Sequence, residues 1–548
     1  MSKEKKDESE VSLRPGDIEL TAHSVGSRGD ILSLLKGHPS SKVGGRPFER
    51  SVDYVCRLGA KGVVVQDPAQ DPDYLAEYLA FYGKLFVPIH RYCRRLHFFK
   101  SGPRDKEDAL TFIDRVHAQK SDYLGFITLR PIPGAPVGAT FLAAPKNPDF
   151  ACSIENFEVN FGGRTFTVDA IPFMQQDNAV GACAQASIWM ALRALRKRSG
   201  NSAYDPAQIT SAATRYLTVN RTSPGREGLT FPQMMEAVRS SGHQALPLQF
   251  ISMDPLANER GLEHRKKKIY PYVESGFPTI LILQKKDDLE GHAVIAVGHK
   301  WNPKPASTDT IRSVLNPAVK AGESTVSVLH AATWTPEFLI HNDNTGPYES
   351  LPSVAAEGDS GYGLQDVQFA MVPLPLDIYI SAEEAEVRAL GLLHMMLHAI
   401  QGANNNAPEF DPARASDKLV LRPYLMRRKE FRKWAVEEPR LPEQLKKRYR
   451  QLPLPQHVWV FELNLVDGYA EAPQSRSRRV GEILVDPTAD NRGGVITVAA
   501  HLNVSATFGT STGGKQLGVF FHRGQWMGDV NVLELIDGDQ TYLPRVHP

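Results

Sequence analysis

The sequence has few cysteines, and they are far apart. Its 548 residues contain only Cys56, Cys93, Cys152 and Cys183, and no two of them form a CxxC pair. This spacing argues against a disulfide framework and against a thiolate zinc site. We therefore expect a reduced, cytoplasmic protein that uses no metal and no cofactor.

Net charge and long apolar runs are also lacking. The chain has 63 Lys and Arg against 62 Asp and Glu, so no overall field attracts nucleic acid, and we do not expect nucleic acid as a partner. The longest apolar runs, such as "FPTILIL", fall short of the ~18 residues of a membrane-spanning helix, so we expect no membrane partner. Residues 1–15 are highly charged, which predicts disorder.

The chain is too long for one ordinary core, and its patterns predict an α+β fold in several domains. Ser381 and Glu384 are spaced as a capping box and predict a helix that follows them. The polar stretch 301–335 is predicted to be a surface excursion between strands. The expected parts are a disordered N-terminus at 1–15, an α+β domain at 16–165, a central α+β domain at 166–375, and a C-terminal α+β domain with a basic segment at 376–548.

Cys183 opens a predicted helix in the segment "GACAQASIWMALRALRKR". A helix N-terminus lowers the pKa of a thiol, and the small residues Gly181 and Ala182 leave room beside the sulfur for a substrate. These features predict that Cys183 is a nucleophile and, alone among the four cysteines, a thiolate at neutral pH. The alternative is a small core residue on an apolar helix, which is a common role for a lone cysteine.

Partners for this thiol follow later in the chain. His292 begins the predicted strand of "GHAVIAVGH", where its ring lies at a sheet end within reach of a thiol. "FLIHNDN" places Asn342 and Asp343 at the end of another strand, and strand alternation predicts that only one of them faces His292. Gln176 could donate its amide to an oxyanion, together with the backbone N–H of Cys183.

Taken in order, these segments resemble the papain-like cysteine peptidase superfamily over roughly residues 165–350. They are most similar to its bacteriocin-processing, or double-glycine, peptidase-like branch. The resemblance implies a central papain-like fold in which the helix with Cys183 packs on an antiparallel sheet. It implies that Cys183 is the nucleophile, His292 the general base, Asn342 or Asp343 the orienting residue, and Gln176 or Gln175 the oxyanion donor. Papain-type enzymes favour Asn342, and the bacteriocin-processing branch favours Asp343.

The function predicted in this way is that of a cysteine peptidase or isopeptidase. It would hydrolyse a peptide-type bond of a protein or peptide substrate through a thioester on Cys183. Two alternatives stay open from the sequence. One is an acyltransferase of transglutaminase type, and the other is an inactive papain-like scaffold that binds other proteins.

Three weaker patterns have ordinary structural explanations. His394 and His398 have the spacing of a zincin, but Met395 replaces the required glutamate and no third ligand is indicated. The basic and aromatic segment at 90–99 is predicted to cover a core rather than to bind nucleic acid. The segment 422–450 has eleven Lys and Arg against four Glu, which predicts solvated helix faces; an acidic partner is the alternative.

Overall fold

The fold is described from a computed structural model of the chain. The expected disorder of residues 1–15 lies outside the described residues. The structure describes residues 17–35, 46–86, 89–119, 122–132, 134–146, 150–176, 183–201, 203–216, 228–250, 261–285, 291–305, 310–314, 327–356, 361–403, 419–438, 443–469, 478–488, 496–500, 504–510 and 517–522.

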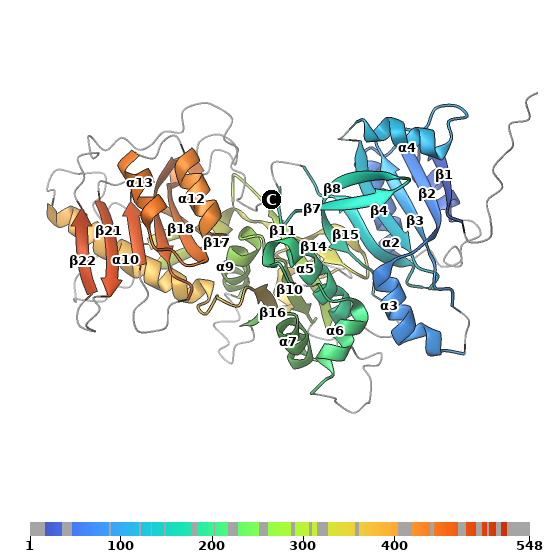
Figure 1. The fold of residues 1–548 in the computed structure, drawn as a ribbon. Helices are drawn as coiled ribbons and strands as arrows, with labels where there is room; N and C mark the ends of the chain where they lie inside the picture. Colours follow the sequence, from blue (N-terminus) through green and yellow to red (C-terminus); the bar gives the residue numbers. More distant parts are fainter. Residues whose placement is uncertain are drawn as a thin grey trace, which may run out of the picture.

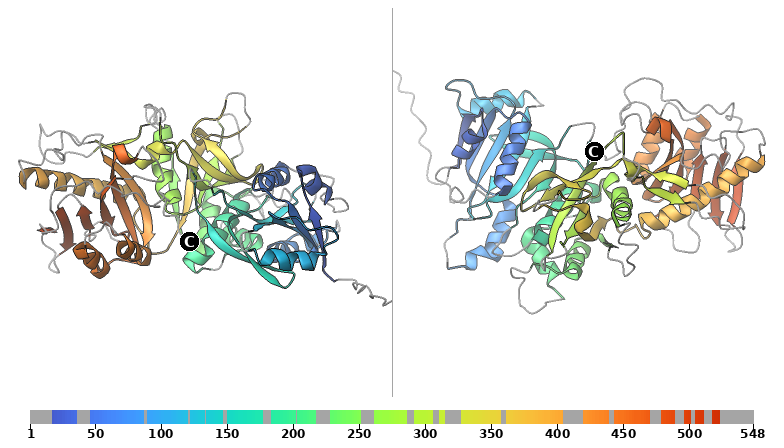
Figure 2. Two further views of the ribbon diagram at one scale, coloured as in Figure 1. Left: turned by 90° about the horizontal axis from the view of Figure 1, so that it is seen from above. Right: turned by 180° about the vertical axis from the view of Figure 1, so that it is seen from behind.

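The described chain is a mixed α+β protein built on three sheets, which confirms the expected class at this level. The strands pair antiparallel, apart from one parallel pair among those described, β13 with β17. The three sheets follow one another along the molecule, with the N-terminal sheet at one end and the C-terminal sheet at the other (Figures 1 and 2). No helix within the described ranges is long and apolar enough to cross a membrane.

The first sheet has seven strands in the order β1-β2-β3-β4-β5-β8-β7. Its inner strand β4 is buried along its whole length because helices and strands cover both faces. Strand β8 runs through the expected domain boundary at residue 166. The elements are β1 Glu19–Ser24, α1 Arg28–Ser33, α2 Arg46–Arg57, β2 Gly62–Ala69, α3 Pro72–Ala80, β3 Cys93–Phe99, α4 Ala109–His117, β4 Tyr123–Leu129, β5 Val137–Ala143, β7 Glu155–Phe161 and β8 Arg164–Phe173.

The basic and aromatic segment at 90–99 forms strand β3 in this sheet. Arg94 pairs with Asp67 at 2.6 Å and donates to a backbone carbonyl. Arg95 pairs with the buried Asp71 at 3.0 Å. Because both guanidinium groups are already paired within the protein, this segment has a structural role.

The second sheet has the order β15-β14-β11-β10-β16-β9, and β6 also pairs with β11. Helix α5 packs on one face of this sheet, and α9 packs on the other (Figure 1). Apolar residues run along α5 from Ile188 to Leu195 and hold it against the sheet. The elements are β6 Phe150–Cys152, α5 Cys183–Ser199, α6 Pro206–Ala213, α7 Phe231–Ser240, β9 Gln244–Gln249, α9 Gly261–Glu274, β10 Thr279–Leu283, β11 His292–Lys300, β14 Glu337–Asn342, β15 Gly346–Pro352 and β16 Val367–Leu374.

The third sheet has eight strands in the order β12-β13-β17-β18-β19-β20-β21-β22. Its first two strands come from residues 301–335, where the sequence predicted a surface excursion. That prediction is wrong for the described part, because Ile311, Val328 and Trp334 are buried in the core. The elements are β12 Arg312–Val314, β13 Ser327–His330, α10 Ala382–Ala403, β17 Leu419–Arg427, α12 Arg428–Glu437, α13 Glu443–Gln451, β18 His457–Leu465, α14 Val466–Tyr469, β19 Arg478–Val485, β20 Ile496–Ala500, β21 Val504–Thr510 and β22 Leu517–His522.

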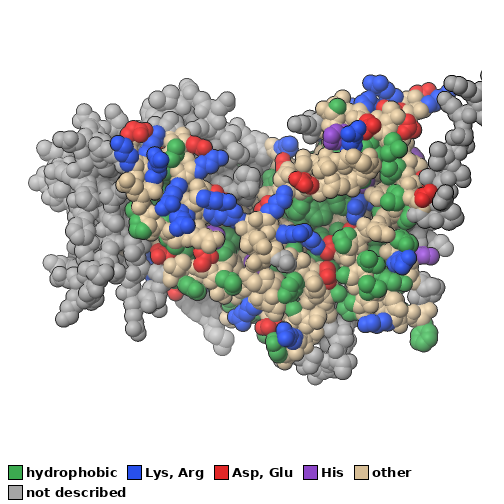
Figure 3. All heavy atoms as spheres, viewed as in Figure 1, with side chains coloured by type: hydrophobic (Ala, Val, Ile, Leu, Met, Phe, Trp, Pro, Cys, Tyr) green, Lys and Arg blue, Asp and Glu red, His purple; other side chains and the backbone are tan. Residues whose placement is uncertain are grey.

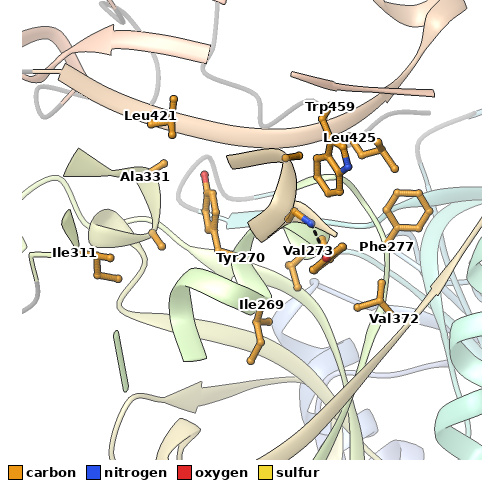
Figure 4. Packing of buried hydrophobic residues seen from close by; sticks show 14 of the residues in the cluster. Ile269, Tyr270, Val273, Phe277, Ile311, Ala331, Val372, Leu421, Leu425 and Trp459 are labelled. Carbon is orange, nitrogen blue, oxygen red and sulfur yellow. Dashed lines mark hydrogen bonds between the residues drawn. The ribbon is translucent and has the colours of Figure 1, made fainter. Parts of the chain in front are cut away.

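One hydrophobic core joins the second and third sheets. Figure 4 shows Tyr270 and Val273 of α9 between the strands of the two sheets, with Leu421, Leu425 and Trp459 on the C-terminal side. The Tyr272 and Trp459 rings meet edge to face at 5.8 Å. The central and C-terminal parts are therefore fused rather than linked loosely.

A buried charge cluster lies within this junction. Arg422 of β17 donates to Glu274 at the end of α9, with 2.7 Å between Nε and the carboxylate. The same carboxylate bonds His299 of β11 at 2.6 Å, and Glu462 of β18 approaches Arg422 at 3.4 Å. Burial alone would raise the pKa of Glu274, but Arg422 and His299 hold it below its usual range.

The basic segment 422–450 is thus not one continuous surface. Its first part is the strand β17 with the buried Arg422, and its later part forms α12 and α13. Phe431, Ala435 and Tyr449 pack inward, while basic side chains cover the outside of these helices (Figure 3), among them the exposed Arg428, Lys429, Lys433, Lys447 and Arg450. An acidic partner for this surface stays a prediction.

Candidate active site

Cys183 is the first residue of α5, and this helix end packs against strand β11. Ser187, one turn further along the helix, donates to the carbonyl of Ala293 at 3.0 Å. The Cys183 side chain is half-buried at the edge of the core. The residues expected to clear space beside it, Gly181 and Ala182, lie outside the described residues. Cys183 therefore stands beside the start of the strand that carries His292.

His292 begins β11 and is almost completely buried. Its Nε2 donates to Oδ1 of Asn342 at 2.9 Å. The side-chain amide of Asn344 faces the other nitrogen, Nδ1, at 3.4 Å. An amide oxygen accepts a hydrogen bond and an amide nitrogen donates one, so together they favour the neutral tautomer with hydrogen on Nε2 and a lone pair on Nδ1.

Asp343 approaches the same nitrogen of His292, at 3.5 Å from Nε2. The expectation that only one of Asn342 and Asp343 can face the ring is wrong. Strand β14 ends at Asn342, so Asp343 lies in the following turn, where the alternation of strand side chains no longer applies.

The Asp343 carboxyl group is in an unusual setting. It is completely buried, and neither of its oxygens has a well-formed hydrogen bond with another described residue, although the backbone N–H groups of Asp343 and Asn344 lie close enough to favour its charged form. Burial raises its pKa to about 6, and the neighbouring His292 opposes this rise. A positively charged His292 would therefore lie beside a carboxylate whose negative charge few other groups stabilise.

The thiol of Cys183 is neutral at neutral pH in this arrangement. Burial, with the charge of Asp343 as a second cause, raises its pKa to about 12, although the backbone of Ala293 and of the first helical residues favours the thiolate. The sulfur makes no hydrogen bond with the His292 ring among the described contacts. The predicted preformed thiolate is therefore not found, because burial outweighs the helix N-terminus.

Neither Cys56 nor Cys93 lies in a setting that would make it a nucleophile. Burial raises the pKa of both Cys56 and Cys93, and Cys93 is buried in the N-terminal core. The side chain of Cys152 lies outside the described residues.

Of the two glutamines proposed for the oxyanion hole, only Gln176 lies beside the candidate triad. Its side-chain amide donates to Oδ1 of Asn344 at 2.7 Å, and Asn344 in turn faces His292. Gln175 is buried and is used elsewhere, because its side chain bonds the backbone of Val137 at 3.1 Å and of Gly134 at 3.1 Å.

Two neighbours of His292 were not predicted from the sequence. Asn344 follows the recognised pair by one residue, and the run "HNDN" could have suggested it. Tyr362 stacks on the imidazole with 5.7 Å between ring centres, and no sequence pattern indicates it. His292, Asn342, Asn344 and Tyr362 line one groove with a volume of about 640 Å³.

Within the described ranges, no group of three or more His, Cys, Asp and Glu residues is arranged to hold a metal ion. His394 is buried on α10, and the side chain of His398 lies outside the described residues. The described site consists of a thiol, an imidazole, a carboxyl group and several amides. These groups can support acyl transfer without a cofactor.

Comparisons with known proteins add no relative to this description. No family model, no curated protein and no solved structure matches the chain.

Proposed function

We propose that the protein is a cysteine hydrolase that cleaves peptide or isopeptide bonds through a thioester on Cys183. The observation that carries this proposal is the oriented imidazole. His292 donates to Asn342, lies beside the buried Asp343, and is placed next to the helix end that bears Cys183. An oriented base beside a thiol is the arrangement that nucleophilic catalysis requires.

The first step is proton transfer from the Cys183 thiol to Nδ1 of His292. Asn342 keeps the hydrogen on Nε2, which leaves the lone pair on Nδ1. The thiol takes the place of the Asn344 amide at this nitrogen as substrate enters. The imidazolium is stabilised by the Asp343 carboxylate, and the sulfur attacks the substrate carbonyl carbon as its proton leaves.

The second step breaks the carbon–nitrogen bond of the substrate. The backbone N–H of Cys183 and the side-chain amide of Gln176 donate to the oxyanion of the tetrahedral intermediate. His292 returns its proton to the leaving amine, which leaves an acyl group on the sulfur. A water molecule then gives its proton to His292 and attacks the thioester, which releases a carboxylic acid and restores the thiol.

The papain-like fold stays part of this proposal. Support for it comes from the order of the elements, since the helix with Cys183 precedes the antiparallel strands with His292 and Asn342 and packs on their sheet. The same chemistry occurs on unrelated folds, so the proposal rests on the site rather than on the fold.

Two observations favour a second function, that of a non-catalytic binding protein. The pKa of Cys183 is raised, and among the described contacts no hydrogen bond joins its sulfur to His292; both fit a site that has lost catalysis. A reactivity measurement separates the two proposals.

We expect a peptidyl acyloxymethyl ketone, which alkylates the active cysteine of such enzymes, to label the full-length protein at Cys183 alone. Labelling should be abolished in Cys183→Ala and retained in the matched control Cys56→Ala, because Cys56 has no imidazole beside it. Intact mass and peptide mapping would measure both. Labelling of Cys56 at the same rate, or no labelling of native protein, would reject the hydrolase in favour of the binding protein.

Asn342 and Asn344 provide a contrast at the two ring nitrogens of His292. Asn342→Ala should slow labelling by about 100-fold, because the imidazole loses the acceptor that fixes its tautomer. Asn344→Ala should speed labelling by about 3-fold, because it removes a donor that competes with the thiol for Nδ1. Labelling rates over a range of probe concentrations measure both effects. Equal losses in the two variants would show that neither amide acts as described.

A further inference from the structure

The groove beside His292 has a basic wall that the proposed chemistry does not use. Arg46, Arg50 and Arg57 line the same groove as His292, and all three come from α2 of the N-terminal part. This helix lies against β15, next to the turn that holds Asp343 and Asn344 (Figure 1). The N-terminal part therefore supplies one side of the candidate active site.

The three arginines form a single stripe on α2. Their spacings of four and seven residues place them on one face of a helix. All three are exposed. Arg46 and Arg50 make no hydrogen bond or ion pair with other described residues, and Arg57 lies over the Tyr54 ring at 5.7 Å. Unlike Arg94 and Arg95, their guanidinium groups have no carboxylate bound to them in the described structure.

The acidic residues of the groove only partly offset this charge. Glu337 is already bound to Lys300. Glu349 lies close enough to all three arginines that they lower its pKa, but burial has the larger effect and raises it. Three guanidinium groups thus face Glu349 as the one described carboxyl of the groove that is not bound to a lysine, so the groove stays positive.

We propose that this groove binds the acidic side chains of a peptide substrate, and that the arginines of α2 select substrates with Asp or Glu close to the bond that Cys183 attacks. This inference rests on the proposed function for the cleavage itself, but not for the binding. Planar guanidinium groups are suited to carboxylates because they offer paired donors.

The length of the arginine stripe determines how much of a bound peptide the arginines can contact. From Arg46 to Arg57 the helix rises by about 16 Å at about 1.5 Å per residue. An extended peptide covers that length in about five residues at about 3.3 Å per residue. The arginines can therefore contact acidic residues spread over about five consecutive positions of the peptide.

Binding is measured separately from catalysis. The probe is a rhodamine-labelled peptide of about ten residues that alternates Glu with Ala and Gly, compared with its Gln counterpart by fluorescence anisotropy on full-length Cys183→Ala. We expect the Glu peptide to bind about 10-fold more tightly at low salt, and the preference to shrink as salt is added. The combined change Arg46→Gln, Arg50→Gln and Arg57→Gln should remove the preference.

The matched control is Arg28→Gln. Arg28 is exposed and pairs with Glu49 and Asp53 of α2, but it does not line the groove. This variant should keep the preference for the Glu peptide. Equal binding of the two peptides to the native groove, or a preference that survives in the triple variant, would overturn the inference.

The same experiments separate a failure of this inference from a failure of the proposed function. If the acyloxymethyl ketone labels Cys183 but the peptides bind equally, the hydrolase stands and the acidic selection fails. If the Glu peptide binds through the arginines but no labelling occurs, the groove is an acidic-peptide site of a non-catalytic protein. Melting temperatures of all variants confirm that the exposed substitutions leave the fold intact.

Discussion

Replacing Asp343 by Asn is expected to slow acylation of Cys183 by about 1,000- to 10,000-fold while making the protein more stable at neutral pH. The activity falls because the imidazolium of His292 loses the buried carboxylate that lies 3.5 Å from Nε2. The stability rises because a buried carboxylate without a well-formed hydrogen bond to another described residue is replaced by a neutral group of the same shape.

The gain in stability depends on pH in a defined direction. Burial raises the pKa of Asp343 to about 6, from the ordinary value of about 4 for an aspartate, so the folded protein holds this proton more tightly than the unfolded chain does. The native protein then loses stability relative to the Asn variant as pH rises between about 4 and about 6. Above that window the variant should be more stable by about 1–3 kcal/mol, and below it the difference should vanish.

Asp73 supplies a matched control. It is another buried carboxyl group whose pKa burial raises to about 6, but its partner is Arg193 and not His292. Asp73→Asn should shift stability with pH in the same direction, because burial raises the pKa of Asp73 to about 6 as well, but it should change the acylation rate little, because Asp73 does not face His292. Melting temperatures at pH 4 and pH 7.5, together with labelling rates, measure all of these effects. Loss of both activity and stability in Asp343→Asn would mean that this carboxyl group is structural.

Replacing Arg422 by Ala is expected to reduce the free energy of unfolding by about 3–5 kcal/mol. The change leaves the completely buried carboxylate of Glu274 with His299 as its remaining partner in the cluster. Removing one member of a buried ion pair is costly because the other charge stays in a medium of low polarity.

The exposed Arg428 of α12 is the comparison for this variant. Arg428→Ala removes the same charge from the next helix together with one hydrogen bond to the Leu454 carbonyl, at 2.9 Å, and should change stability by only about 1 kcal/mol. Denaturant unfolding followed by tryptophan fluorescence reports on this junction, because Trp459 lies in its core. A cost for Arg422→Ala no greater than that for Arg428→Ala would show that the buried cluster contributes little to stability.

Local sequence signals predicted several helices and strands well. The helix after Ser381 begins as the capping box predicts, with Glu384 and Ser381 bonded to each other's backbone at 3.0 and 3.2 Å. The strands with His292 and Asn342 also lie where their apolar runs indicate. These features depend on residues that are close together in the chain, so they can be predicted from the sequence alone.

Features that depend on distant segments could not be predicted. The register of β11 on β14 pairs Ile295 with His341 and brings the turn after Asn342 opposite His292. Neither strand's sequence specifies that register, so the sequence could not tell that both Asn342 and Asp343 approach the ring. Strand β12 is only three residues long and has no alternating pattern, so its place in the third sheet had no local signal.

Because β13 pairs within the third sheet, the central part cannot complete its structure without the C-terminal part. This strand leaves the central part, pairs in parallel with β17, and returns to β14 within a few residues. A chain that ended at residue 375 would keep β13 but lose β17, which would expose unpaired backbone groups and the apolar residues around Val328. Such open edges promote self-association, so residues 1–375 are expected to aggregate when they are produced without the C-terminal part.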